Sequence, residues 1–310
     1  MGIGESAALT AALLWAISSM FWGKIHLSAL GMNLGKNAVG SILLVTHIGL
    51  LSMIWWQPMI TASYTSIGWL SLSGFVGIVI GDTFFFRSLQ ILGPRRALVM
   101  ATTAPLFGAA LGWCLGERLQ VAAFMGILLT LIGVSVVVSD RRAKQEAPGL
   151  MPGTMLAGIL CGLGGALCQA AGGALSKLGL VDCEGLEATL IRILASLVCT
   201  LILAAAQRRL TEICRRICQR PLLKFLIPAA AMGTWLGVWL SQIAFKQAPL
   251  ASALTLLATS PLFAIPIVHF YFGHKTSVLA LVGSIVAITG IFIVVSYSGP
   301  VETTTTMPNY

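Results

Sequence analysis

Charged side chains are scarce in this chain of 310 residues. They make up 9% of the sequence, and only ten of them are aspartate or glutamate, whereas about 25% of the residues of a soluble domain are charged. With 57% hydrophobic residues, the chain lacks the polar surface that a soluble protein of this length needs. Its apolar runs are also longer than the roughly ten-residue strands of an outer-membrane barrel. The composition therefore predicts an all-α membrane protein with many spans.

Several functional motifs are absent as well. The sequence has no phosphate-binding P-loop, which excludes ATP-driven pumping by this chain alone. The seven cysteines fall mostly in apolar segments, where they are expected to pack as small hydrophobic residues. Cys214 and Cys218 lie in a basic loop without nearby histidine or acidic ligands, so we expect neither a metal nor a cofactor. The net charge of +9 is not accompanied by a basic, aromatic surface, so no nucleic-acid partner is expected.

The chain contains one stretch twice. The segments Gly93–Ser139 and Pro249–Ser296 align over their whole length, about 157 residues apart. Each copy has a Pro-Leu-Phe core, at Pro105 and at Pro261, and each ends in Val-Val-Ser. Each has the pattern of two long apolar helices joined by a short polar hairpin. An offset of half the chain length indicates two similar halves.

Hydropathy over a window of roughly 20 residues predicts about ten membrane-spanning helices. The predicted spans are Ser6–Trp22, Asn37–Trp56, Ile67–Leu92, Arg95–Leu115, Val121–Ser139, Pro152–Leu175, Leu186–Ala206, Leu223–Phe245, Leu250–Tyr271 and Ser277–Ser296. We expect a first five-helix repeat over residues 1–139 and a second over residues 152–298. A linker loop, residues 140–151, joins them, and residues 299–310 are expected to form a disordered tail.

Five spans per half is an odd number, so the second half must be inverted in the membrane relative to the first. An inverted-topology repeat is the architecture of many secondary transporters. Most loop lysines and arginines fall on one face, including those of the segment Arg208–Lys224, whereas the other face holds most of the loop carboxylates. Because basic loops stay in the cytoplasm, we expect both termini on the outside.

The repeated segments resemble the EamA-type family of the drug/metabolite transporter superfamily. The resemblance rests on the Pro-Leu-Phe core, on the hairpin Gly116-Glu117-Arg118 and on the glycine-rich last helix of each half, and it covers nearly the whole chain. The second hairpin departs from the family pattern, since it is Gly273-His274-Lys275. The resemblance implies ten helices in two inverted repeats, a central cavity between the halves, and export of small metabolites or drugs across an inner membrane. It names no substrate.

The eighth predicted span carries the clearest candidates for solute binding. Four side chains recur there at helical spacing and share one stripe: Trp235, Trp239, Gln242 and Lys246. Such a stripe suits a pocket that stacks an organic solute on aromatic rings and orients it with a few hydrogen bonds. The alternative is that the tryptophans pack against neighbouring helices or lipid and that Lys246 extends to the interface.

The equivalent stripe of the third span carries Thr83 and Phe86, and Phe86 is a further candidate for solute binding. Asp82 lies beside this stripe, deep in an apolar run, and Arg87 flanks the stripe on its other side. Burial favours the neutral form of a carboxyl group. We therefore expect Asp82 to contact solute and, with Arg87, to couple proton uptake to export. The alternative is a structural ion pair between Asp82 and Arg87 or another basic residue.

Other polar or aromatic residues within spans are weaker candidates. Trp15 in span one and Gln169 in span six lie on helices that line the cavity in the resembled family. Lys36 and Arg192 hold similar places near the starts of spans two and seven, and we interpret them more readily as head-group anchors than as ligands. His47 is expected to be a buried histidine with a satisfied hydrogen bond rather than a proton relay.

Prolines and glycines predict how the spans bend and pack. Pro105 and Pro261 interrupt span interiors and permit kinks, and Gly116 is expected to end a helix at the hairpin. Spans five and ten each carry two glycines seven residues apart, which give the helix a smooth face: Gly126 with Gly133, and Gly283 with Gly290. We expect this face to serve packing within each half, with a dimer contact as the alternative.

An intramembrane enzyme is the main competing function. Gly81-Asp82 resembles part of the site of intramembrane aspartyl proteases, but no second intramembrane aspartate is present to complete the pair, so we expect no enzyme. The sequence favours a secondary transporter in the plasma membrane that exports amino acid-like, nucleoside-like or drug-like solutes by alternating access, with proton coupling as a hypothesis. Uptake or exchange, and less readily a channel or sensor, are the alternatives. The expected partners are a small-molecule solute and the lipid bilayer, for a monomer or homodimer.

Overall fold

The computed structural model describes most of the chain, namely residues 2–22, 24–55, 60–92, 94–139, 154–264, 267 and 278–297. Within these residues the secondary structure is helical, and no strand forms. The predicted linker at 140–151, the predicted tail at 299–310 and the second hairpin at 273–275 lie outside the described residues.

The helices follow the predicted spans closely. Those of the first half are α1 (Ile3–Trp22), α2 (Ala29–Trp55), α3 (Tyr64–Ser73), the π-helix η1 (Gly74–Ile80), α4 (Gly81–Leu92), α5 (Pro94–Ala101), α6 (Ala104–Cys114) and α7 (Val121–Ser139). Those of the second half are α8 (Met155–Gly179), α9 (Gly185–Ala206), α10 (Leu210–Ile217), α11 (Arg220–Ala230), the π-helix η2 (Ala231–Gly237), α12 (Val238–Gln247), α13 (Leu250–Leu257) and α15 (Val278–Tyr297). The largest departure is α2, which begins at Ala29 rather than at Asn37.

Eight helical rods of the described chain are long and apolar enough to cross a membrane. Three of them are composite: α3, η1 and α4 form the rod Tyr64–Leu92, α5 and α6 form the rod Ala97–Cys114, and α11, η2 and α12 form the rod Arg220–Gln247. Two shorter apolar helices, Leu250–Ala264 and Leu281–Tyr297, occupy the places of the ninth and tenth predicted spans. The predicted all-α membrane fold of two five-helix repeats is therefore confirmed.

The two halves share an unusual local feature, a seven-residue π-helix. η1 covers Gly74–Ile80 and η2 covers Ala231–Gly237, so the offset of about 157 residues that relates the sequence repeats also relates the two π-helices. π-helices are rare and occur mostly as single bulges, frequently at functional sites. Because the π-helices recur at equivalent positions, spans three and eight are the spans in which both repeats depart from regular α-helix.

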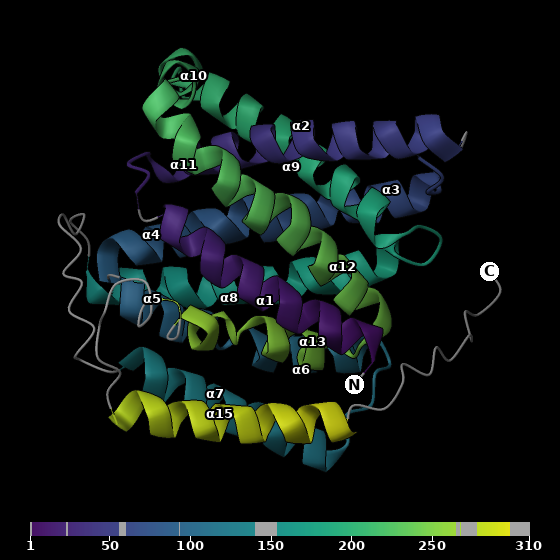
Figure 1. Ribbon diagram of the computed structural model, residues 1–310, viewed down its shortest axis with the longest axis vertical. Helices are drawn as coiled ribbons and strands as arrows, with labels where there is room; N and C mark the ends of the chain where they lie inside the picture. The colour runs from purple at the N-terminus through teal and green to yellow at the C-terminus, as the bar shows by residue number, and fades with distance from the viewer. Residues whose placement is uncertain are drawn as a thin grey trace.

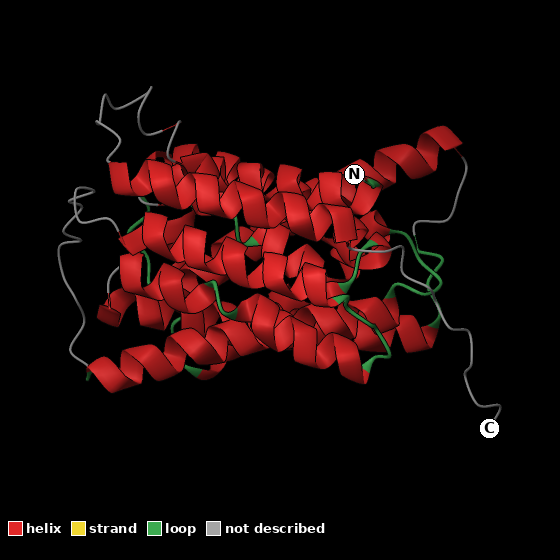
Figure 2. Cartoon of the chain, turned by 90° about the horizontal axis from the view of Figure 1, so that it is seen from below, coloured by secondary structure: helices red, strands yellow, loops and turns green. Residues whose placement is uncertain are grey.

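The helices lie side by side along a common direction in both views, as membrane spans do (Figures 1 and 2). The start of α1 and the end of α15 lie at one end of the bundle, and α10 lies at the other (Figure 1). Both ends of an even number of crossings must lie on one side, as observed. The largest group of buried apolar residues joins α1, α8, α12 and α13, so the core straddles the two halves.

Spans four and nine are each interrupted just before a proline. A turn at Thr102 and Thr103 separates α5 from α6, and a turn follows α13 at Ala258. Proline has no backbone N–H and fits the first turn of a helix, so the kinks predicted at Pro105 and Pro261 take the form of a break followed by a new helical start. Gly116 has a φ of +86°, the left-handed conformation predicted for a residue that ends a helix.

The glycine faces of α7 and α15 meet each other at one edge of the bundle (Figure 1). A Cβ at Gly126 would stand 2.9 Å from the Val294 nitrogen, and a Cβ at Gly133 would stand 2.6 Å from the Gly283 oxygen. Only glycine permits two backbones to approach this closely. The prediction that these faces serve packing within each half is wrong, because the contact joins the last helix of one half to the last helix of the other.

Replacing Gly133 by alanine is expected to lower the free energy of unfolding by about 1–3 kcal/mol, because the added Cβ would press on the backbone of α15. Gly49→Ala in α2 is the matched control, since nothing lies within 4 Å of a Cβ built there. Unfolding in mixed detergent micelles measures both variants. Equal stability of the two would contradict a contact between the halves through this glycine.

Candidate functional site

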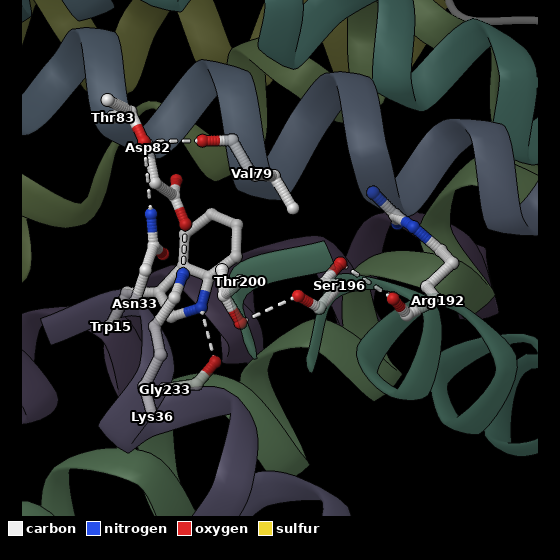
Figure 3. Close-up of polar contacts among 10 residues, drawn as sticks. All are labelled: Trp15, Asn33, Lys36, Val79, Asp82, Thr83, Arg192, Ser196, Thr200 and Gly233. Atoms are coloured by element: carbon white, nitrogen blue, oxygen red, sulfur yellow. Dashed lines mark hydrogen bonds and ion pairs between the residues drawn. The ribbon is translucent and has the colours of Figure 1, made fainter. Parts of the chain in front are cut away.

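The clearest charged contact inside the bundle is an ion pair between Lys36 of α2 and Asp82 of α4 (Figure 3). The Lys36 ammonium donates to Oδ2 of Asp82, and the two side chains are 15% and 30% exposed. Lys36 lies two turns inside α2, and Asp82 lies in the first turn of α4, directly after η1. The interpretation of Lys36 as a head-group anchor is therefore wrong, and the partner of Asp82 in this pair is a basic residue from another helix.

Arg192 of α9 lies near this pair without taking part in it. The residue is 6% exposed, and its Nε has no hydrogen-bond partner. Among the described residues, no carboxylate lies within ion-pair distance of its guanidinium. Its Nη2 lies against η1, where a Cβ at Gly77 would stand 3.4 Å away, and the guanidinium turns toward the rod that carries Asp82 (Figure 3). Arg192 is buried in the bundle, so the head-group interpretation fails for it too.

Polar side chains form a stripe on the buried face of α2. Asn33, Asn37 and Ser41 are one helical turn apart and at most 5% exposed. The Asn33 amide donates to Thr83 Oγ1 at 3.5 Å, but its oxygen, both polar atoms of Asn37 and the Ser41 hydroxyl have no partner within the described protein. Polar atoms inside a membrane bundle usually face a polar pathway or a partner. The sequence signal for this stripe is the spacing of four residues between its polar side chains.

The tryptophans of the predicted stripe contact a histidine. Trp235 Nε1 donates to His47 Nδ1 at 3.3 Å, and the ring centroids of Trp235 and Trp239 each lie 5.4 Å from that of His47, edge to face. His47 therefore accepts the expected hydrogen bond, but it is half-buried rather than buried. Trp15 Nε1 donates to the Gly233 carbonyl in η2 at 3.0 Å, which places this third ring beside the same π-helix.

The remaining predicted residues are spread more widely. Gln242 is fully buried beside Gly185, at the start of α9, and Lys246 pairs with Glu184 at 2.7 Å. The stripe therefore packs against α2 at one end and against the start of α9 at the other. Phe86 is half-buried on α4, with its ring centroid 5.9 Å from that of Phe85, and Gln169 is half-buried on α8. Arg87 is exposed on α4. A solute contact for any of these residues stays a prediction.

Two pockets lie away from these residues. One, of about 370 Å³, is lined by the first hairpin and its neighbours, including Trp113, Glu117 and Arg118. The other, of about 340 Å³, lies between His26 and Arg216. Neither is lined by a predicted solute-binding residue, and the central cavity implied by the resemblance stays an expectation.

Comparison with known proteins assigns the architecture. The model of the EamA-like transporter family matches residues 2–139 and 156–296, one match for each half. The chain belongs to this family. No curated protein matches the sequence. A solved structure described only as a crystal structure of a protein has the same fold, with a TM-score of 0.72 at 18% identity over 95% of this chain and 97% of its own.

Membership in the EamA-like family makes the chain a multi-pass membrane transporter of the drug/metabolite type. Glu117 of the first hairpin, which the sequence identified only as part of the family pattern, has a structural role. One Glu117 oxygen lies 2.5 Å from the Lys177 ammonium at the end of α8, and the other accepts from the Leu250 nitrogen at 2.8 Å. The Lys177 ammonium also donates to the Ala248 carbonyl at 2.6 Å. Glu117 thus caps the start of α13 and ties the first half to the second.

Replacing Glu117 by glutamine is expected to cost about 3–5 kcal/mol of stability, because it leaves the Lys177 charge buried without its partner. The two side chains are only 10% and 12% exposed. The double variant Glu117→Gln/Lys177→Met should recover much of that loss, since it removes the uncompensated charge. Unfolding in mixed micelles measures the cycle. Additive losses in the double variant would show that the two charges do not stabilise each other.

Proposed function

We propose that this EamA-like transporter is a secondary exporter of small metabolites in the plasma membrane, and that proton uptake by Asp82 drives it. The observation that carries the proposal is the Lys36–Asp82 ion pair, which lies inside the bundle and joins α2 to the composite rod of span three. Removing two charges from water is costly, and their mutual attraction offsets that cost only while both are charged. Protonation of Asp82 therefore weakens the link between the two helices.

The placement of this pair suits alternating access. Asp82 directly follows η1, a π-helix, and such widened turns are common where helices bend. In inverted-repeat carriers, one group of helices rocks against the other around a fixed solute site. A proton on Asp82 would release α2 from span three and permit this movement, and loss of the proton would restore the pair.

Aromatic side chains are available for the solute on the neighbouring helices. Trp235, Trp239 and Trp15 gather around η2 and His47, and flat rings of this kind stack amino acid-like, nucleoside-like or drug-like molecules. This composition favours an organic solute over an inorganic ion. Uptake or exchange by the same carrier would use the same residues, so direction is decided by experiment.

Loop charge supports the orientation required for export. The basic segment that contains α10 lies at the end of the bundle opposite the start of α1 (Figure 1), and basic loops stay in the cytoplasm. We therefore place the two termini outside. A reporter fused to the C-terminus that is active only in the cytoplasm would reverse this orientation.

The Asp82→Asn variant is expected to fold and to lose transport driven by a pH gradient, because the amide accepts no proton and carries no charge for Lys36. Asp182→Asn is the matched control, since Asp182 lies in a loop, where it accepts from the Ser63 nitrogen at 3.1 Å. A growth-resistance screen of an overexpressing strain against toxic amino acids, nucleosides and cationic drugs first supplies the solute. Flux into proteoliposomes with and without a pH gradient then compares the variants.

An unchanged response to the gradient in Asp82→Asn would remove the coupling role and leave a carrier driven by the solute gradient or by exchange. Accumulation of the toxic solutes instead of resistance would assign uptake. Flux that does not saturate with solute concentration would assign a channel.

A further inference from the structure

We propose that Arg192 binds a carboxylate of the transported solute, and that the carrier is therefore selective for small organic monoanions. The inference deepens the proposed export function and rests on it. It starts from the three charged residues of Figure 3, Lys36, Asp82 and Arg192, which belong to three different spans.

The repeat explains why two cations lie in the bundle. Lys36 and Arg192 hold similar places in the two halves, since each lies about two turns inside the second helix of its repeat. Because the repeats are inverted, these places lie at mirrored depths. The bundle thus holds a cation toward each face of the membrane.

Asp82 balances only one of these two charges. Its carboxylate pairs with Lys36 and forms no ion pair with Arg192. Within this group of three residues, two cations and one carboxylate leave a single positive charge. Glu187, a further buried carboxylate of α9, accepts from the Thr61 and Ala62 nitrogens and forms no ion pair with Arg192. A buried, uncompensated cation is strongly unfavourable, so one negative charge from elsewhere would stabilise the site, and a monoanion supplies that charge without excess.

The Nε donor of the Arg192 guanidinium is available for such a group. Its Nε has no hydrogen-bond partner in the described protein although the residue is 94% buried, since 6% of it is exposed. Gly77 of η1 and Gly172 of α8 pack closely beside it, because a Cβ at Gly77 would stand 3.3 Å from the Gly172 Cα and 3.4 Å from Arg192 Nη2, so the guanidinium lies directly against the backbone of the π-helix. The fork of an arginine matches the two oxygens of a carboxylate. The unpaired donor of Arg192 thus lies beside the π-helix η1, at the contact between Gly77 and Gly172.

The test compares acids with their amides on the purified full-length protein. The probes are benzoate with benzamide and N-acetyl-leucine with N-acetyl-leucinamide, and phenyl phosphate tests a different oxyanion. The acids should raise the thermal unfolding midpoint, and the amides should not. Arg192→Met should lose this response. Arg192→Lys keeps the charge but not the fork and should weaken binding about tenfold. Arg216→Met, which removes an exposed cation of α10, should respond as wild type.

If Arg192→Met does not fold, Arg192→Lys and the acid–amide comparison carry the test. Equal responses to an acid and its amide, or an undiminished acid response in Arg192→Lys and Arg192→Met, would overturn the proposal. A response to phenyl phosphate alone would overturn the carboxylate assignment. Flux measurements separate this failure from failure of the proposed function. Saturable flux of neutral solutes that is unchanged in Arg192→Met would refute only the anion site. The absence of saturable flux for any solute would refute the transporter role itself.

Discussion

A bilayer offers no water to an unpaired charge, and this constraint decides which helices of the protein are neighbours. Asp82 and Glu117 each find their cation on a helix far away in sequence, Lys36 and Lys177 respectively. The first pair joins α2 to α4 within one half, and the second joins the hairpin of one half to α8 of the other. Apolar packing alone gives little preference between helices in lipid, because lipid tails are as apolar as leucine. The few charges and the facing glycines therefore supply much of the specificity.

The two halves contain π-helices at equivalent positions, but different residues pack against them. η2 is covered by the Trp15 ring, whose nitrogen bonds to the Gly233 carbonyl. η1 is met by a glycine, since Gly172 of α8 lies against Gly77. The same backbone widening thus meets an aromatic ring in one half and a glycine in the other. Arg192 of the second half lies against η1, the π-helix that meets the glycine.

The sequence was sufficient for the architecture, because hydropathy and an offset of half the chain need no tertiary information. It also singled out Asp82, since an isolated carboxylate in an apolar run is conspicuous. Its partner could not be found, because Lys36 is separated from it by 46 residues and lies on another helix. Lys36 lies just before the predicted start of span two, but α2 begins eight residues earlier, at Ala29, so the side chain lies within the helix. No such shift applies to Arg192, because α9 begins at Gly185, one residue before the predicted start. The π-helices could not be predicted from the sequence, because the periodicity of the side chains was interpreted with 3.6 residues per turn.

The inverted repeat makes one property of the charged site independent of conformation. In the proposed rocking of the halves, a single carboxylate cannot pair fully with both Lys36 and Arg192, because these two cations lie at mirrored depths. Whichever face of the membrane the pathway opens to, one of these cations therefore lacks its partner. Protonation of Asp82 increases the number of cations without a carboxylate partner from one to two. A carrier built in this way is stabilised most by a solute that brings its own negative charge, and it is least stable when it reorients empty with Asp82 protonated.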